Sequence, residues 1–247
     1  TVKRPKDRFD LVNPQENADL LWISLKNSGQ VGSNGNPDHP FYGNGPTPVL
    51  PDILFAGPNF GLSANDPRAN PGLYNIDPGA GPIYDIVAFN KSGTNWFNEL
   101  FKPALKQTHN VTVSGGSDKN RYLFSMSYLD EQGTYLNTYL KRYTARVNTE
   151  FTLLNTIRIG ENLQLEYSQN PRTGNWIGPI IFTDPYLPVK DIKGNWSNKN
   201  NALAGPVGDP YGSNPVAQRI ASKDDKDNSW QIFGNIYGEV DFLKKFT

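Results

Sequence analysis

The 247-residue chain carries 24 basic and 24 acidic residues, so it lacks the excess positive charge with which nucleic-acid-binding proteins meet phosphates. It has no cysteine, which excludes disulfides, thiolate metal sites and cysteine nucleophiles, and its two histidines leave little room for a histidine-built zinc site. Abundant glycine and proline, together with 12% aromatic residues, favour an all-β protein with long loops.

Residues 1–107 are rich in turns and contain one clear helix signal. The run NPQE at residues 13–16 predicts an N-cap, a proline at the first helical position and a capping glutamate. Apolar residues that this helix is expected to bury then recur at helical spacing: Ala18, Leu21, Trp22 and Leu25. Frequent prolines predict an irregular run over 29–93, and a second short helix is expected within 94–101.

Residues 108–169 alternate apolar and polar side chains with the period of two that β-strands require. Within 121–130 one face is apolar: Tyr122, Phe124, Met126 and Tyr128. Ser125 and Ser127 lie on the other face. The polar faces of 141–153 and 157–168 include five charged residues: Arg142, Arg146, Glu150, Arg158 and Glu166. Tight turns are expected at 115–120 and 154–156.

Residues 170–227 return to loop composition, with a short helix expected after the Asn-Pro pair at 214–215. A last strand follows within 228–247, and its alternation is clearest over 230–242. The predicted strands are therefore separated alternately by short turns and by one very long connection.

Such alternation fits either a soluble antiparallel sheet with one wet face or a transmembrane β-barrel. The predicted strands, at about 11–13 residues, match the roughly 9–11 residues that cross a bilayer at a tilt plus an overhang. Aromatic residues near the strand ends resemble interfacial girdles, and barrels have short turns on one side and long loops on the other. The barrel is therefore favoured. Glu161 falls on the apolar face, where a carboxylate facing lipid would be unfavourable. It fits a barrel only if it lies near the periplasmic interface or a bulge turns it inward.

Several segments resemble the SusC/RagA family of TonB-linked outer-membrane proteins. The most specific is QTHNVTVSGGSDK at 107–119. Weaker matches keep their order along the chain: LVNPQENADL at 11–20, GTNWFNELF at 93–101, YLDEQG at 128–133, IGENL at 159–163 and NPVA at 214–217. The combination is specific, although each piece alone is weak.

The resemblance implies a section of a transmembrane antiparallel barrel of about 22 strands, starting just after its first strand. Residues 1–107 would be an outer-face loop region with short helices, 108–169 barrel strands, 170–227 a long, partly helical extracellular loop, and 228–247 a further barrel strand. The family has an N-terminal plug, which contacts TonB, and nothing in this chain matches it. An internal fragment of this kind could not close a barrel alone.

The implied activity is non-covalent uptake of an oligomeric nutrient, a glycan or an oligopeptide, with a SusD-like surface lipoprotein. No catalytic residue, cofactor or metal is then expected, and outer-membrane lipid is the surrounding solvent. Four rings in the predicted outer loops are candidate ligand contacts: Trp176, Tyr186, Trp196 and Tyr211. They could instead pack the loops together. The charged residues of the polar strand faces would face the lumen, where they could line a substrate path or pair across strands.

Two other classes of protein stay open on the sequence alone. One is a soluble secreted β-sheet module that binds carbohydrate, and the other is a secreted hydrolase with acidic catalysts. The long loops also carry apolar residues that either dock the lipoprotein or bury one another: Leu54, Phe55, Phe60, Trp176, Ile180, Ile181 and Phe182.

Overall fold

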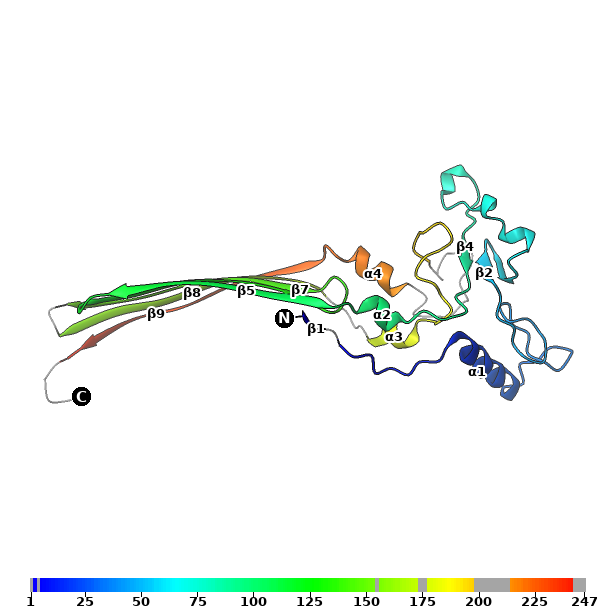
Figure 1. Cartoon of the computed structure of the whole chain (residues 1–247), viewed down its shortest axis with the longest axis horizontal. Helices are drawn as coiled ribbons and strands as arrows, with labels where there is room; N and C mark the ends of the chain where they lie inside the picture. Colours follow the sequence, from blue (N-terminus) through cyan, green and yellow to red (C-terminus); the bar gives the residue numbers. More distant parts are fainter. Residues whose placement is uncertain (1, 4, 154–155, 173–176, 198–213, 242–247) are drawn as a thin grey trace. The chain divides into compact units, whose positions relative to one another are not determined.

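The structure, a computed structural model, describes residues 2–3, 5–153, 156–172, 177–197 and 214–241. The chain divides into two compact units, and Figure 1 labels most of their helices and strands. The strand unit consists of Thr1–Pro5, Phe101–Thr173 and Ser222–Thr247. The loop unit consists of Lys6–Leu100 and Gly174–Ala221. No helix among the described residues is long and apolar enough to cross a membrane.

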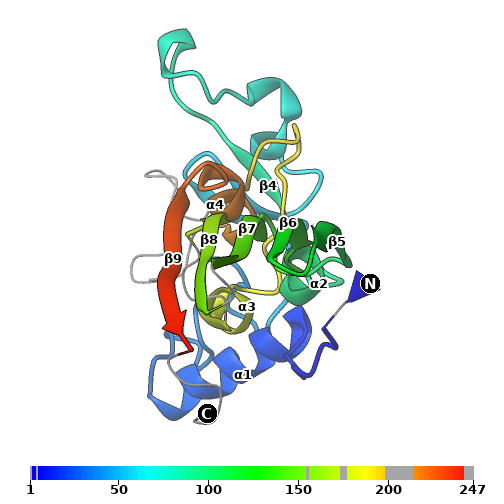
Figure 2. The same cartoon turned by 90° about the vertical axis from the view of Figure 1, so that its left-hand side faces the viewer.

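The strand unit is one antiparallel sheet in the order β1-β5-β6-β7-β8-β9. The end-on view of Figure 2 shows β5 to β9 side by side in this order. Its strands are β1 (Val2–Lys3), β5 (Ala104–Gly116), β6 (Asn120–Gln132), β7 (Tyr139–Leu153), β8 (Ile157–Pro171) and β9 (Lys226–Val240). The expected all-β antiparallel architecture is confirmed, and strands of 13 to 15 residues far exceed the usual soluble length of about 5–6.

The strand bounds differ from the sequence-based ones at several ends. β5 begins at Ala104, before the expected residue 108, and β9 spans 226–240 where the clearest alternation lay at 230–242. Backbone pairing such as Lys106 with Glu131 and Pro171 with Lys226 continues where the side chains no longer alternate. Ladder hydrogen bonds use only main-chain groups, so a strand can outlast its side-chain pattern.

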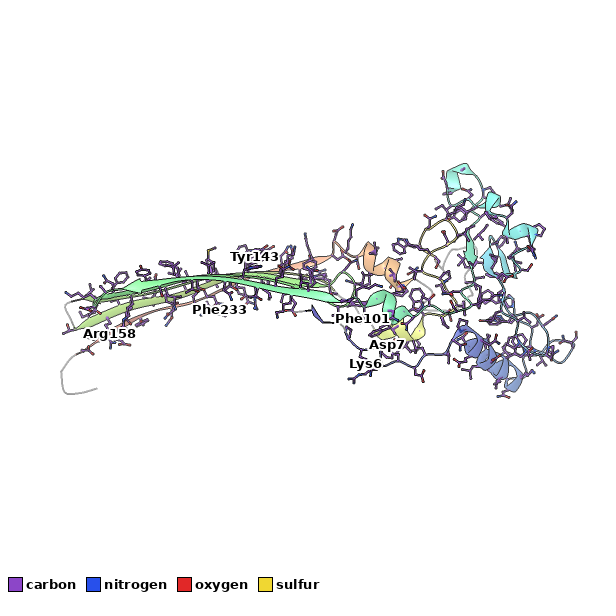
Figure 3. The ribbon with its side chains drawn as sticks, viewed as in Figure 1. Lys6, Asp7, Phe101, Tyr143, Arg158 and Phe233 are labelled. Carbon is purple, nitrogen blue, oxygen red and sulfur yellow. The ribbon has the colours of Figure 1, made fainter. Side chains whose placement is uncertain are left out.

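The register of the sheet is continuous and fixes its two faces. Phe124 pairs with Val113 and Val147, while Ser125 pairs with Thr112 and Arg146. The expected opposite orientation of Phe124 and Ser125 is therefore confirmed. Figure 3 shows the same alternation, with Tyr143 on one face of the sheet and Phe233 on the other.

Helix α1 (Pro14–Asn27) of the loop unit starts as its sequence predicted. The Glu16 backbone N–H donates to Asn13 Oδ1 at 2.9 Å, and Glu16 Oε2 accepts from the Asn13 N–H at 2.8 Å. Ala18 and Trp22 are buried, whereas Leu21 and Leu25, also expected in the core, are only half-buried. The second predicted helix is α2 (Trp96–Leu100).

Residues 29–93 are more regular than expected. They contain a small antiparallel sheet of β2 (Ile53–Ala56), β3 (Asn59–Leu62) and β4 (Ile86–Ala88), in the order β3-β2-β4. They also contain three short 3₁₀ turns: η1 (Pro67–Ala69), η2 (Pro71–Leu73) and η3 (Pro78–Ala80). Each turn begins with a proline that directly follows an Asp or Asn N-cap. These prolines therefore start turns as well as interrupting regular secondary structure.

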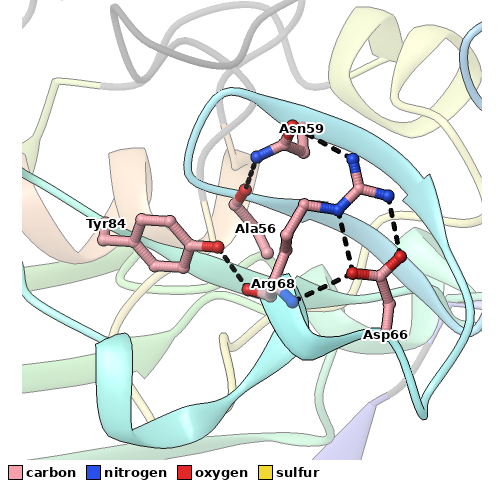
Figure 4. Close-up of polar contacts among 5 residues, drawn as sticks. All are labelled: Ala56, Asn59, Asp66, Arg68 and Tyr84. Atoms are coloured by element: carbon pink, nitrogen blue, oxygen red, sulfur yellow. Dashed lines mark hydrogen bonds and ion pairs between the residues drawn. The ribbon is translucent and has the colours of Figure 1, made fainter.

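An arginine network holds the η1 turn against the small sheet (Figure 4). Arg68 donates from Nε and Nη2 to the two carboxylate oxygens of Asp66 at 2.8 and 2.7 Å, and from Nη1 to Asn59 at 3.4 Å. The side-chain and backbone hydrogen bonds that Asp66 accepts from Arg68 lower the pKa of its carboxyl to about 2. The Tyr84 hydroxyl donates to the Arg68 carbonyl.

The second long connection contributes α3 (Ile177–Phe182) and α4 (Pro215–Ala221). The helix expected after residues 214–215 is confirmed as α4, whose first turn is capped by Asn214. Segments from the two long connections, nearly a hundred residues apart, share one compact unit.

Candidate functional site

One face of the long sheet carries a row of aromatic rings at a single level. Neighbouring strands contribute His109, Tyr128, Tyr143, Tyr167 and Trp230, which the register places directly opposite one another. Consecutive ring centroids lie 6.3, 4.9, 6.2 and 4.8 Å apart. Amphipathic rings gathered at one height are typical of the boundary between lipid and water.

The same sheet face is polar on one side of this row and apolar on the other. One row outward, every position is polar: Gln107, Asp130, Lys141, Gln169 and Asn228. In the other direction the face stays mostly apolar to the row of Leu153, Ile157 and Val240. From Tyr143 to Leu153 the strand rises about 34 Å at ~3.4 Å per residue. At a tilt of about 40° this gives roughly 26 Å, against an expected apolar band of about 25 Å.

The side chains between these rows are exposed in the isolated chain. Met126, Ile232 and Ile236 have 69%, 70% and 82% of their surface accessible. A continuous apolar surface of this extent is unfavourable in water and requires an apolar surrounding or partner.

Glu161 stays on this apolar face. Its register neighbours are Thr149 and Ile236, and the pairing of β8 with both neighbours runs without a shift through this position. The possibility that a bulge turns Glu161 inward is therefore wrong. The residue lies two rows from Ile157, the first residue of β8. A carboxylate costs much less there than at the midplane.

The opposite face is mostly polar and is held by contacts between strands. Arg158 forms a salt bridge of 2.6 Å with Glu239, and Arg146 donates to Gln164 at 2.6 Å. Asn162 donates to Asn235 at 3.1 Å. By register all five charged residues named from the sequence lie on this face: Arg142, Arg146, Glu150, Arg158 and Glu166.

Glu150 has a partner that the sequence did not suggest. The hydroxyl of Tyr237, two strands away, donates to Glu150 Oε2 at 2.9 Å. The ring can cross because Gly160 occupies the intervening position, where a β-carbon would collide with it. A glycine inside a clear strand alternation is the signal that could have revealed this close approach.

Of the four candidate ligand-binding rings, the structure describes Tyr186 and Trp196. Tyr186 is 5% exposed and stacks on Phe89 at 5.1 Å, with Phe41 and Tyr42 around it. Trp196 is 38% exposed, and the Lys190 ammonium lies 2.9 Å from its ring centroid. Trp176 and Tyr211 lie outside the described residues. The Tyr186 ring therefore packs the two connections together.

A buried carboxyl pair lies in the loop unit. Asp85 and Asp191 are 7% and 8% exposed, and burial, followed by the charge of Asp191, raises the pKa of Asp85 to about 6. Asp191 accepts from the Tyr74 hydroxyl at 2.6 Å and from the backbone N–H groups of Lys193 and Asn195 at 2.8 and 2.9 Å. The pair links η2, the start of β4 and the loop at 190–197.

The described residues contain no group of three or more His, Cys, Asp or Glu side chains that could hold a metal ion. Their arrangement offers two chemically different sheet faces and a loop unit with a buried aromatic and carboxyl interior.

Comparison with known proteins agrees with the motifs. No family model matches the chain. It is 28% identical over 171 residues to the TonB-dependent receptor SusC of Bacteroides thetaiotaomicron, covering 63% of this chain and 17% of that protein. It is 28% identical over 125 residues to the TonB-dependent receptor P26 of Formosa agariphila, covering 50% of this chain and 12% of that protein.

Among solved structures, the RagAB peptide importer in its closed-closed state aligns with 63% of this chain and 18% of the solved chain, at 19% identity and a TM-score of 0.49. The chain spans less than a fifth of the length of the curated relatives that it matches. The predicted resemblance is confirmed by these relatives, and the chain is similar to a section of three TonB-dependent receptors, SusC among them.

Proposed function

We propose that the chain is part of an outer-membrane transporter that imports an oligomeric nutrient, a glycan or an oligopeptide, together with a SusD-like surface lipoprotein. The observation that carries the proposal is the two-faced sheet with its aromatic row. This apolar face is about 26 Å high and is bordered at one end by a row of five rings in register. Such a face matches the apolar thickness of a bilayer, whereas a soluble module would expose it to water.

The parts of the chain then have distinct roles. The face of Met126 and Ile236 contacts lipid, and the face of Arg146 and Glu150 lines the lumen. The two long connections of the loop unit lie outside the cell and contact the lipoprotein. TonB acts through a plug that no part of this chain resembles. Uptake makes and breaks no covalent bond, so the proposal needs no catalytic residue or cofactor.

The orientation of the sheet can be tested in the full-length transporter within intact outer membranes. Met126→Cys and Ser125→Cys, each in a cysteine-free background, place a thiol on opposite faces of one strand. Oxygen, which concentrates in lipid, should speed the relaxation of a nitroxide spin label at 126. A water-soluble nickel chelate should do so for a label at 125. The reverse pattern would contradict the proposed barrel.

The alternative function is a soluble secreted β-sheet module that binds carbohydrate. It predicts that the protein stays monodisperse without detergent, although the face of Ile232 and Ile236 is exposed. Aggregation in buffer and recovery in detergent would favour the transporter. Uptake assays on cells that lack the gene, fed with glycans or peptides in turn, would then identify the nutrient.

A further inference from the structure

A groove of about 420 Å³ lies within the loop unit, beside the start of α1. Its walls come from three stretches of chain: 7–17, 92–96 and 181–185. A second hollow shares Asp10, Leu11 and Val12 with it and continues along α1 past Leu20 and Ile23. Together they form a track that an extended ligand of several residues could follow.

Many polar groups of the groove are already engaged. Asp7 accepts from the Phe9 N–H at 3.0 Å and from Asn95 at 3.2 Å. Thr94 donates to the Leu187 carbonyl at 2.7 Å, and the Trp96 indole N–H donates to the Asp184 carbonyl at 3.1 Å. These contacts shape the groove and leave those groups little capacity for a ligand.

Three other groups are left for a ligand. The Thr183 hydroxyl is buried without a hydrogen-bond partner among the described residues, although the residue is only 5% exposed. Within the same residues no hydrogen bond or ion pair engages the carboxylate of Asp10 or the side-chain amide of Asn17. Buried polar groups are normally satisfied, so an orphan hydroxyl at a groove wall points to a missing polar partner.

The remaining wall is apolar and exposed. Leu11, Val12, Ile181 and Phe182 all line the groove, and Phe182 has 54% of its surface accessible. Leu11, Val12 and Ile181 offer aliphatic surface that suits the apolar side chains of a peptide, and the exposed ring of Phe182 adds to it. The mixture of an amide, a hydroxyl and aliphatic surface fits a peptide backbone that carries apolar side chains.

The charged residues of the groove favour a ligand of one charge over the other. Its lining includes the carboxylates of Asp7, Asp10 and Asp184 and no lysine or arginine. The positive end of α1 does not offset them, because Glu16 caps it, and the continuing track adds Asp19. Anionic ligands are disfavoured, and an ammonium or guanidinium group beside Asp10 is stabilised.

We propose that this groove binds a short oligopeptide with an apolar side chain against Phe182 and a cationic group, its N-terminus or a basic side chain, at Asp10. The assignment rests on the proposed function, since it names which oligomeric nutrient this part of the transporter contacts. Asn17 and Thr183 then pair with the peptide backbone.

The test is binding of fluorescent hexapeptides to the full-length transporter purified in detergent, measured by polarisation. The probes are an alternating lysine–leucine peptide, its glutamate–leucine counterpart and, as competitor, maltoheptaose. Asp10→Asn and Phe182→Ser are each expected to weaken the lysine–leucine peptide about tenfold, through loss of a charged contact and of apolar contact area. Asp38→Asn, an exposed carboxylate outside the groove lining, makes the same charge change and should leave affinity unaltered.

Equal affinity of the two peptides, wild-type affinity of both groove variants, or displacement of the peptide by maltoheptaose would overturn the assignment. The spin-label experiment on residues 125 and 126 tests the proposed barrel independently of the groove. If the peptide-binding test fails while the spin labels give the expected pattern, only the groove assignment is wrong. If the spin-label pattern is reversed, the proposed function is wrong.

Discussion

The phenol ring of Tyr237 lies over Gly160 of the neighbouring strand, in the space that a side chain at 160 would occupy. The ring thereby reaches across β8, and its hydroxyl donates to Glu150 on β7 at 2.9 Å. Three strands of the polar face are joined by one side chain. The contact buries ring surface on a face that is otherwise held by exposed polar pairs.

Gly160→Ala should therefore destabilise the folded protein by about 1–3 kcal/mol, because a β-carbon forces the Tyr237 ring out of place. The temperature at which the protein unfolds in a heat-modifiability gel should fall. Gly238→Ala is the matched control, since nothing lies within 4 Å of a β-carbon at that position. Equal unfolding temperatures for the two variants would contradict the packing role of Gly160.

Tyr237→Phe keeps the ring and removes only the hydrogen bond to Glu150. We expect a loss of about 0.5–1.5 kcal/mol, the usual net worth of one such bond. Glu150→Gln keeps an acceptor and should cost less than the tyrosine change. A larger loss in Glu150→Gln than in Tyr237→Phe would show that Glu150 has a second, more important partner.

The Arg158–Glu239 salt bridge should contribute little to stability despite its 2.6 Å distance. Its two side chains are 43% and 52% exposed, and exposed pairs are worth about 0–1 kcal/mol. Glu239→Gln is expected to shift the unfolding free energy by less than about 1 kcal/mol, with a smaller effect at high salt. Chemical denaturation at two ionic strengths measures this. A loss well above that limit at high salt would indicate a buried pair.

The Asp85–Asp191 pair predicts a pH-dependent stability of the loop unit. The pKa of Asp85 is raised to about 6 in the folded chain, so the folded state holds this proton more tightly than the unfolded state. The stabilisation is complete below the ordinary carboxyl range, near pH 4, and is lost as the pH rises through about 6.

Amide hydrogen exchange of residues 190–197, corrected for its intrinsic pH dependence, should therefore be faster at pH 7.5 than at pH 4.5. The Asp191 carboxylate accepts from Tyr74 and from the backbone of that loop, and no basic side chain is among the causes of the Asp85 shift. Asp85→Asn, which cannot ionise, should remove the difference. Unchanged pH dependence in that variant would assign it to other groups.

Local patterns in the sequence determined much of this protein. The capping run at 13–16 fixed the start of α1, because the cap hydrogen bonds join residues only three apart. The period-two alternation fixed which residues of β6, β7 and β8 share a face, because side chains of a strand point alternately to opposite sides. The family resemblance rested on short motifs of the same kind.

Contacts between distant residues were decided only by the tertiary structure. Nothing near Tyr186 in the sequence indicated that it would stack on Phe89, and nothing near Gly160 named Tyr237 as the ring above it. The small sheet of β2, β3 and β4 also depends on a partner strand about thirty residues away. Such contacts form because the two long connections must bury their apolar side chains somewhere, and the energy of that burial does not depend on distance along the chain.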